Sequence, residues 1–449
     1  MLIDIPKKDD VSLYISRRKE LVSFIKKERS IEKGAILLFA NFENDSRLFR
    51  QDGTFFYLTG IQEPGAALFV DLIGESTLYA PQQKDSREKW VDVKVPLKKE
   101  NKQELGVDKV ALLGDESPGY SFYPFFKEEQ YKNLIEEIQH IMLVGGKLCV
   151  LSPDSSDEYV EQRLVLERLK KIIPGLEKHI VDISDLVAQM RRKKDMHEIE
   201  KLYEAIGVTT MAHEAAAQAI ESDVTEKEVQ GTLEYIFTAS SAHAAFPSVV
   251  ASGKNGTILH YTTNRSTLKN GDLVIVDIGA QVDGYCADLT RTYPVSGSFT
   301  KRQKELYNIV LETQNYIADI ACPGMWLRNK KEPDKSLHHL AEKFLESKGL
   351  KKYFVHGIGH FLGLDVHDVG NHQRPLQEGD VFTIEPGVYI PEESIGIRIE
   401  DNYWMVKDGL VCLSEELPKD PDAIESFMKD RPDESPSDLS ISDDDFIEN

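Results

Sequence analysis

The segment from His356 to Glu400 constrains what this 449-residue chain can fold into more than any other part of it. Four of the chain's twelve histidines lie in its first part, namely His356, His360, His367 and His372. Two carboxylates follow, Glu385 and Glu400, each directly after an isoleucine. Neutral imidazole nitrogens and anionic carboxylate oxygens together suit a first-row divalent metal ion. The segment therefore predicts one half of a metal site, whose other half must come from elsewhere in the chain.

Two aspartates earlier in the chain supply candidates for that other half. Asp277 interrupts an apolar run at residues 273–278, and Asp288 follows the strong hairpin signal Asp283-Gly284. We therefore expect Asp277 and Asp288 on adjacent antiparallel strands, close enough to share a cation. An aspartate is disfavoured in a strand and is costly to bury without a partner, so two in paired strands favour a metal site over solvated side chains.

The last predicted strand carries two further polar side chains on one face. Ile397 and Ile399 alternate with Arg398 and Glu400, and successive side chains in a strand point to opposite faces. Arg398 and Glu400 therefore share the face opposite the isoleucines, and Glu400 is expected to point toward the predicted site.

The length of the chain and its patterning predict two domains and a tail. A chain of 449 residues is longer than a single hydrophobic core usually supports. Short apolar runs alternating with helical patterns indicate an α/β domain over residues 1–178, with strands at 35–40, 55–59, 66–70, 76–79 and 147–151. Residues 179–418 are expected to form the second, site-bearing domain, which opens with one helical pattern over 185–219. The acidic residues 419–449 are expected to form a disordered tail.

Composition excludes several classes of protein. The formal net charge of −22 argues against binding to nucleic acid, which needs a basic face. No run of eighteen apolar residues indicates a membrane span, and no apolar run of a signal peptide is present at the N-terminus. Cys149, Cys286, Cys322 and Cys412 lack paired spacing, which argues against disulfides and zinc–thiolate sites. We therefore expect a cytoplasmic location.

The assembled donor set predicts metal-assisted hydrolysis. Its five members are Asp277, Asp288, His360, Glu385 and Glu400. Four carboxylates exceed the needs of one ion but suit two dications about 3.5–4 Å apart. Oxygen-rich ligation favours Mn²⁺, Fe²⁺, Co²⁺ or Zn²⁺ over thiolate-seeking metals. Such a pair holds a water whose pKa falls to about 7, which supplies a hydroxide for attack on a carbonyl group.

A helical zinc-protease motif fails on local grounds. His356 and His360 have the right spacing, but that motif needs a glutamate after the first histidine, and Gly357 and Gly359 disfavour a helix. The glycines instead let the backbone pass close to a crowded centre. His360 is therefore assigned to the metal, which leaves His260, His356 and His367 as candidates for supporting the site or touching substrate.

Over most of its length, from about Asn44 to Val411, the chain resembles aminopeptidase P, in the wider group with prolidase, methionine aminopeptidase and creatinase. The resemblance rests on His-Gly-x-x-His…His-Asp-Val-Gly at residues 356–370, Thr-Ile-Glu-Pro-Gly-x-Tyr at 383–389 and Gly-Ile-Arg-Ile-Glu-Asp at 396–401. The stretches Arg50-Gln51, Phe56-Tyr-Leu-Thr-Gly60 and Glu63-Pro64 are similar to its N-terminal domain. The resemblance implies a creatinase-type α/β domain followed by a pseudo-twofold pita-bread domain.

The resemblance also implies roles, a cofactor, a substrate and an assembly. The five ligands match those derived above, holding two divalent metals, usually Mn²⁺. His260, His356 and His367 match histidines that touch the substrate or its tetrahedral intermediate, Arg398 matches an arginine near the metals, and Glu385 is also the candidate proton shuttle. The substrates would be peptides with an Xaa-Pro N-terminus, and the enzyme a homodimer or homotetramer. The short loop at Arg374 departs from the family pattern, which puts a substrate role for Arg374 in doubt.

Three alternatives remain at the level of sequence. Prolidase, which cleaves Xaa-Pro dipeptides, shares the ligands and differs in substrate length. Methionine aminopeptidase also shares the ligands but is not expected to carry so long a first domain. A non-catalytic binding module on the same fold usually lacks some ligands, whereas this chain has all five.

Overall fold

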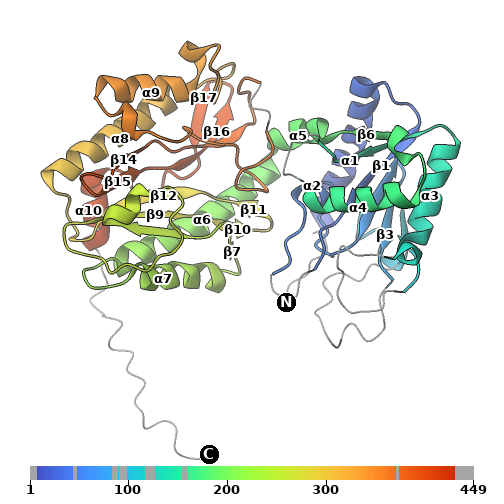
Figure 1. Cartoon of the computed structure of the whole chain (residues 1–449), viewed down its shortest axis with the longest axis horizontal. Coiled ribbons are helices and arrows are strands. Elements are labelled where there is room, and N and C mark those ends of the chain that lie inside the picture. Colours follow the sequence, from blue (N-terminus) through green and yellow to red (C-terminus); the bar gives the residue numbers. More distant parts are fainter. Residues whose placement is uncertain are drawn as a thin grey trace, which may run out of the picture. The chain divides into compact units, whose positions relative to one another are not determined.

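The computed structural model describes residues 8–43, 48–82, 89, 99–116, 127–153, 159–370 and 374–429 (Figure 1). Contacts within the chain divide it into two units, Met1–Arg191 and Arg192–Asn449. The boundary predicted near residue 178 falls inside the first unit, so the domain limits 1–178 and 179–418 stay a prediction. No helix among the described residues is long and apolar enough to cross a membrane.

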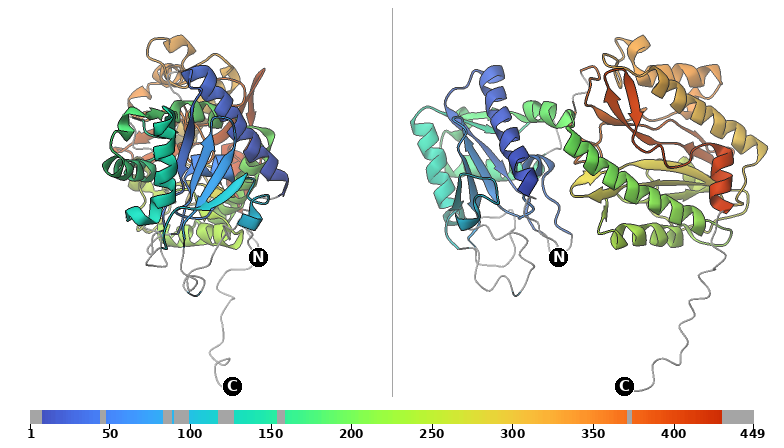
Figure 2. Two further views of the ribbon diagram at one scale, coloured as in Figure 1. Left: turned by 90° about the vertical axis from the view of Figure 1, so that its right-hand side faces the viewer. Right: turned by 180° about the vertical axis from the view of Figure 1, so that it is seen from behind.

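The first unit is built on one mixed sheet, which is seen from two sides in Figure 2. Its six strands have the order β4-β3-β2-β1-β5-β6. Its strands are β1 Gly34–Phe39, β2 Ala67–Asp71, β3 Ser76–Ala80, β4 Lys109–Leu112, β5 Lys147–Val150 and β6 Ile180–Asp182. Its α-helices are α1 Lys8–Arg29, α2 Gly53–Thr59, α3 Lys132–Leu143, α4 Val160–Ile172 and α5 Ser184–Arg192, the last of which ends at the first residue of the second unit. Helices α3 and α4 pack an apolar core against one sheet face, and α1 lies on the other.

The strand predicted at residues 55–59 is wrong, because these residues form α2. Asp52 caps this helix by accepting a hydrogen bond from the Phe55 N–H at 2.8 Å, and Gly60 ends it in the left-handed conformation. The buried aromatic residues of this stretch have strand-like composition, but the cap and the glycine define a short helix.

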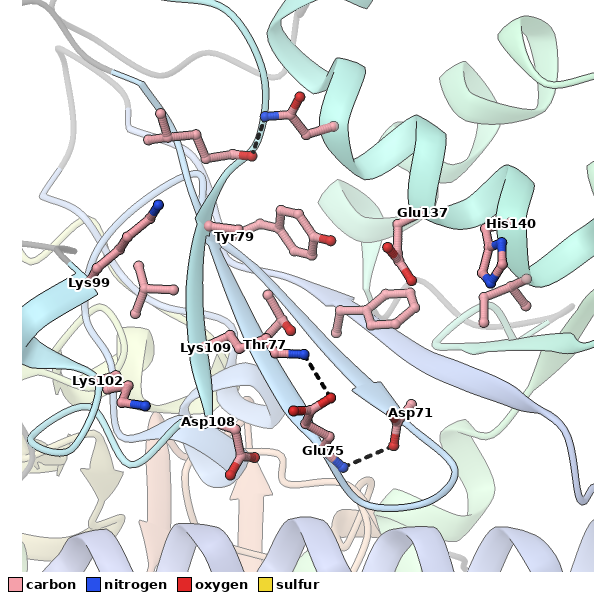
Figure 3. Close-up of a pocket in the computed structure, with 16 residues that line it drawn as sticks. Asp71, Glu75, Thr77, Tyr79, Lys99, Lys102, Asp108, Lys109, Glu137 and His140 are labelled. Atoms are coloured by element: carbon pink, nitrogen blue, oxygen red, sulfur yellow. Dashed lines mark hydrogen bonds and ion pairs between the residues drawn. The ribbon is translucent and has the colours of Figure 1, made fainter.

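A cavity of about 910 Å³ lies in the first unit, between α3 and strands β2, β3 and β4 (Figure 3). Its lining carries charges of both signs, and Lys109 pairs with Glu75 at 2.8 Å. Burial, together with the charge of Glu137, raises the pKa of Tyr79 to about 12. None of the predicted metal ligands lines this cavity.

The second unit has two halves, each combining helices with short antiparallel sheets. The first half contains α6 Met196–Ala219, α7 Glu226–Ala239, β7 His243–Ala244, β8 Val249–Ser252, β9 Leu273–Ile278, β10 Ala280–Val282, β11 Tyr285–Cys286 and β12 Leu289–Pro294. The second contains α8 Lys301–Ile320, α9 Leu337–Ser347, β13 Val381–Ile384, β14 Gly387–Ile390, β15 Ile395–Arg398, β16 Asp401–Val406, β17 Gly409–Cys412 and α10 Pro421–Lys429. Helices α6 and α7 lie on one side of the strands and α8 and α9 on the other (Figure 1), and one apolar core joins both halves.

The helical pattern predicted over 185–219 is broken into α5 and α6. Arg192 pairs with Asp380 and Lys194 with Asp368, and all four side chains are buried. Asp195 then starts α6 by accepting a hydrogen bond from the Glu198 N–H. The buried ion pairs hold the connection between the helices in an extended path.

The tail predicted at 419–449 is wrong in its first part, because residues 421–429 form α10. Ile424 and Met428 are buried against the core of the second unit. From residue 430 onward the predicted tail lies outside the described residues.

Candidate metal centre

The first two predicted ligands are carried by paired strands. β9 and β12 are antiparallel, with Asp277 opposite Thr290, and Asp288 lies immediately before β12. This confirms the predicted pairing. The turn at Asp283-Gly284 closes the separate short hairpin of β10 and β11, with positive φ at both residues. The hairpin signal was therefore right, but β9 and β12 are joined through this inserted hairpin.

His360 lies in an irregular segment, as its flanking glycines predicted. A Cβ atom on Gly359 would lie 1.9 Å from the carbonyl oxygen of Thr383, so only glycine fits this close approach. The Nδ1 atom of His360 donates to the carbonyl of Phe361 at 3.0 Å. This bond leaves Nε2 unprotonated in the neutral ring and free to bind a metal.

The other two carboxylates come from the second half of the unit. Glu385 directly follows β13, and Glu400 forms an isolated bridge with Thr290 that joins the two halves. The Thr290 hydroxyl donates to Oε2 of Glu400 at 2.7 Å. The second oxygen of Glu400 is thereby aimed away from Thr290.

The carboxylates of both halves converge on the Nε2 atom of His360. It lies 3.3 Å from Asp288 Oδ2, 3.7 Å from Glu385 Oε1 and 3.9 Å from Glu400 Oε1. One ligand atom each from Asp288, His360 and Glu400 lie within 4.8 Å of one another. Asp277 is joined to this group through Arg398, whose Nη2 donates to Asp277 Oδ2 at 2.6 Å.

Within the described part of the chain, three carboxylate oxygens of this cluster are buried without a hydrogen-bond partner. They are Oδ1 of Asp277, Oδ1 of Asp288 and Oε1 of Glu400. An unpaired buried acceptor is costly, and an anionic one more so. Their donor chemistry is that of a hard or borderline dication, so the residues present fit a metal site.

The pKa values around the cluster point to the same need for positive charge. Burial raises the pKa of Asp288 to about 6 and that of Glu385 to about 7, and burial with the neighbouring carboxylates raises the pKa of Glu400 well above its ordinary value. Burial alone would lower the pKa of His360, but the hydrogen bond and charge of Asp288 raise it to about 9. A bound cation would let these carboxyl groups ionise together.

A second polar network borders the cluster. Arg398 donates to the Tyr389 hydroxyl at 2.7 Å as well as to Asp277, and the Tyr389 hydroxyl lies 2.9 Å from Nε2 of His356. Burial and the charge of Arg398 lower the pKa of His356 to about 3, so its ring is neutral. Nδ1 of His356 donates to the Gly357 carbonyl at 2.8 Å, so Nε2 accepts from Tyr389.

The remaining predicted site residues lie at the edge of the cluster. The ring of His367 is exposed, with its centroid 4.3 Å from that of His360. His260 is exposed on the segment between β8 and β9, close enough to His356 to contribute, after burial and Arg398, to the lowered pKa of His356. Residues 371–373 of the loop before Arg374, including His372, lie outside the described residues.

Thr290 and Tyr389 were not singled out as site residues by sequence reasoning. Thr290 is two residues beyond Asp288, on the strand that faces Glu400, and strand alternation is a signal that could have identified it. Tyr389 ends the Thr-Ile-Glu-Pro-Gly-x-Tyr stretch, but its bonds to His356 and Arg398 depend on tertiary pairing.

His367→Ala is expected to lower kcat more than metal content. The side chain lies beside His360 but is exposed, and it is not among the five predicted ligands. Metal content per chain and steady-state kinetics on the same sample test this. A loss of metal in proportion to the loss of kcat would instead identify His367 as part of the metal-binding shell.

Together, the fold and this buried cluster of carboxylates around one imidazole define a metal-dependent hydrolase. A sequence model of metallopeptidase family M24 matches residues 200–407, and one of the aminopeptidase P N-terminal domain matches residues 14–117. The Xaa-Pro aminopeptidase of Haemophilus influenzae is 31% identical over 88% of this chain and 93% of its own. The chain therefore belongs to the Xaa-Pro aminopeptidases of metallopeptidase family M24.

Two further relatives bear on substrate. A structure of an Escherichia coli aminopeptidase P variant in complex with substrate is 28% identical, covers 93% of this chain and 98% of its own, and has a TM-score of 0.77. The Xaa-Pro dipeptidase of Pyrococcus furiosus is 35% identical over 53% of this chain and 67% of its own.

The family models and the structural match together give the fold. It is an aminopeptidase P N-terminal domain followed by a pita-bread domain, as predicted.

Proposed function

We propose that this protein removes the N-terminal residue from peptides with proline in the second position. Support comes from the Haemophilus influenzae Xaa-Pro aminopeptidase, which matches across both domains. The observation that carries the proposal is the convergence of the Asp288, Glu385 and Glu400 carboxylates on the Nε2 atom of His360. It is accompanied by one buried oxygen each of Asp277, Asp288 and Glu400 that has no hydrogen-bond partner among the described residues. An N-terminal domain of aminopeptidase type accompanies this site.

In this proposal Asp277, Asp288, His360, Glu385 and Glu400 hold two divalent cations, with Mn²⁺ as the first candidate and Zn²⁺, Co²⁺ and Fe²⁺ as the others. When bound, such cations lower the pKa of a water and polarise the scissile carbonyl. Carboxylates outnumber imidazoles four to one in this set, which favours Mn²⁺ among these metals.

The chain's own residues then orient the reacting groups. Arg398 holds one oxygen of Asp277 at 2.6 Å, and Thr290 holds one oxygen of Glu400 at 2.7 Å, so each carboxylate keeps its other oxygen for the centre. Glu385 is assigned the proton transfer. His260, His356 and His367 are assigned contacts to substrate or to the tetrahedral intermediate.

An aminopeptidase of this kind has a physical reason to rely on metals. The bond before proline is a tertiary amide, so the leaving nitrogen has no N–H through which the peptide can be oriented. Polarisation of the carbonyl does not need that N–H. The side chains around the metal centre then hold the oxygen atoms of the scissile carbonyl group and of its tetrahedral intermediate.

Prolidase activity is the second candidate, because the Pyrococcus furiosus Xaa-Pro dipeptidase is more identical over the part it matches. Turnover of an Xaa-Pro-Xaa tripeptide should be compared with that of the matching Xaa-Pro dipeptide in the presence of Mn²⁺. The proposed function predicts cleavage of the tripeptide after its first residue. Activity on the dipeptide alone would identify a prolidase.

Location and assembly complete the proposal. No disulfide joins Cys149, Cys286, Cys322 or Cys412 in the described part of the chain, which suits a reducing, cytoplasmic compartment. A homodimer or homotetramer is proposed from the family. Light scattering of the purified protein tests the assembly.

A further inference from the structure

Glu226 is a buried carboxylate that lies outside the candidate metal centre. It is the first residue of α7 and is fully buried. No cation pairs with its side chain within the described residues. An unpaired buried carboxylate is costly, so its charge must be balanced by hydrogen bonds and by the N-terminus of the helix.

Five hydrogen bonds converge on this one side chain. Oε1 accepts from the Ser252 N–H at 2.8 Å, the Ser252 hydroxyl at 2.7 Å and the Asn255 amide at 2.9 Å. Oε2 accepts from the Tyr261 hydroxyl at 2.9 Å and the Ser266 N–H at 2.8 Å. Both oxygens are therefore satisfied, in contrast to the unpartnered oxygens of the metal centre.

All five donors belong to one segment, residues 252–266, which begins at the end of β8 and leads toward β9. They lie on both sides of His260, and Tyr261 is its immediate neighbour. The Glu226 N–H also donates to the Ser266 carbonyl at 2.9 Å. The start of α7 therefore fastens both ends of the segment that carries His260.

A nearby asparagine reinforces the same end of the segment. Asn264 is buried in the left-handed conformation, and its amide donates to the Ser248 carbonyl and to Gln230 of α7, both at 2.8 Å. His260 itself is exposed, and His260 contributes electrostatically to the environment of His356. The segment is thus rigidly held while the histidine it carries remains accessible.

We propose that Glu226 is a positioning residue that holds His260 where it meets the substrate. This inference rests on the proposed function, in which His260 contacts the substrate or the tetrahedral intermediate. Glu226 acts only through the segment and touches no reacting atom. Displacement of a reacting group by about 1 Å is enough to cost about a hundredfold in rate.

The test compares Glu226→Gln with a matched control on the same helix. The NH₂ group of the glutamine would face hydrogen-bond donors of residues 252–266, which the carboxylate now accepts from. The segment should therefore shift, and kcat/KM for an Xaa-Pro-Xaa peptide is expected to fall about 10–100-fold. Glu228→Gln removes a charge two residues further on, at an exposed capping position, and is expected to change kcat/KM less than twofold. Metal content should match that of wild type in both variants.

A double-mutant cycle with His260→Ala separates positioning from general damage. If Glu226 acts through His260, Glu226→Gln should lose most of its effect in the His260→Ala background. An undiminished effect of Glu226→Gln in that background overturns the inference. Tyr261→Phe removes one of the five donors and should shift kcat/KM in the same direction by less, which keeps the test valid if Glu226→Gln does not fold.

Amide hydrogen exchange distinguishes failure of this inference from failure of the proposed function. Glu226→Gln is expected to speed exchange in residues 252–266 more than in β9 or β12, whether or not the protein cleaves peptides. If the wild-type protein had no Xaa-Pro activity, faster exchange in Glu226→Gln than in wild type would still support the hold of Glu226 on residues 252–266 and would reject only the proposed function. If the wild-type protein cleaves the peptide but Glu226→Gln leaves exchange in residues 252–266 unchanged, the inference about Glu226 is wrong and the proposed function stands.

Discussion

Glu400→Gln is expected to lower kcat/KM at least about a thousandfold, the consequence of losing several kcal/mol of metal-dependent stabilisation of the transition state. Glu400 is 2% exposed, one of its oxygens is held by Thr290, and the other is unpartnered beside His360. A neutral amide there offers a weaker ligand and removes one negative charge. Asp288→Asn, which removes the charge nearest His360, is expected to have a comparable effect.

The same substitution should not destabilise the metal-free protein. Burial and the charges of Asp288 and Glu385 raise the pKa of Glu400, which means that its ionised form disfavours the folded state. Glu400→Gln should therefore leave the metal-free Tm unchanged or higher, while abolishing the rise in Tm that metal binding produces. Such a loss of function without loss of stability is typical of an active-site residue.

A matched control for this test is Glu393→Gln. Glu393 forms an exposed ion pair with Arg302 at 2.9 Å and is expected to have no effect on kcat/KM. Kinetics after reconstitution with Mn²⁺, metal content and thermal unfolding should be measured on both variants. Near-normal turnover of Glu400→Gln would contradict its assignment as a ligand.

Asp401→Asn, one residue further along, is expected to destabilise the fold by about 3–5 kcal/mol. Asp401 and Arg291 form a buried ion pair at 2.7 Å, with side chains 1% and 0% exposed. Arg291 also donates to the backbone carbonyls of Thr290 and Glu400, so it ties together the strands of both halves. The substitution leaves this buried guanidinium without its counter-charge.

The destabilisation should depend on pH in a defined direction. Burial alone would raise the pKa of Asp401, but the charges of Arg291 and Lys419 lower it below its ordinary value. A carboxyl group with a lowered folded-state pKa stabilises the protein above its unfolded-state pKa of about 4, and this contribution is lost as the pH falls through the folded-state value. The difference in unfolding free energy between Asp401→Asn and wild type should therefore shrink below about pH 4.

Chemical denaturation of the metal-free proteins at pH 7 and at acidic pH measures this difference. Asp422→Asn, which breaks an exposed pair with Lys304, is the matched control and should cost less than about 1 kcal/mol. A cost for Asp401→Asn as small as that of the control would show that the buried pair does not join the two halves.

The convergence of the candidate site was predictable because it rests on short-range patterns. An aspartate inside an apolar strand, a hairpin turn and strand alternation together bring Asp277, Asp288 and Glu400 toward one another. The glycine beside His360 predicted a close approach of the backbone to a crowded centre, and the structure places the carbonyl oxygen of Thr383 at that point. Each of these signals depends on a few neighbouring residues and on covalent geometry.

Of the features that were missed, helix α2 rests on local signals, and the others depend on tertiary partners. Residues 55–59 look like a strand by composition, yet the Asp52 cap and Gly60 make them a helix. The break at residues 193–195 follows from ion pairs with Asp380 and Asp368, which are far away in sequence. Helix α10 is amphipathic but short, and it is held by burial of Ile424 and Met428 rather than by local propensity.

The most direct test of this account is anomalous diffraction from crystals grown with Mn²⁺. We expect two manganese peaks about 3.5–4 Å apart, within bonding distance of Asp277, Asp288, His360, Glu385 and Glu400. A single peak would contradict the two-metal centre. Peaks bound by other residues, or none at these five side chains, would contradict the site itself.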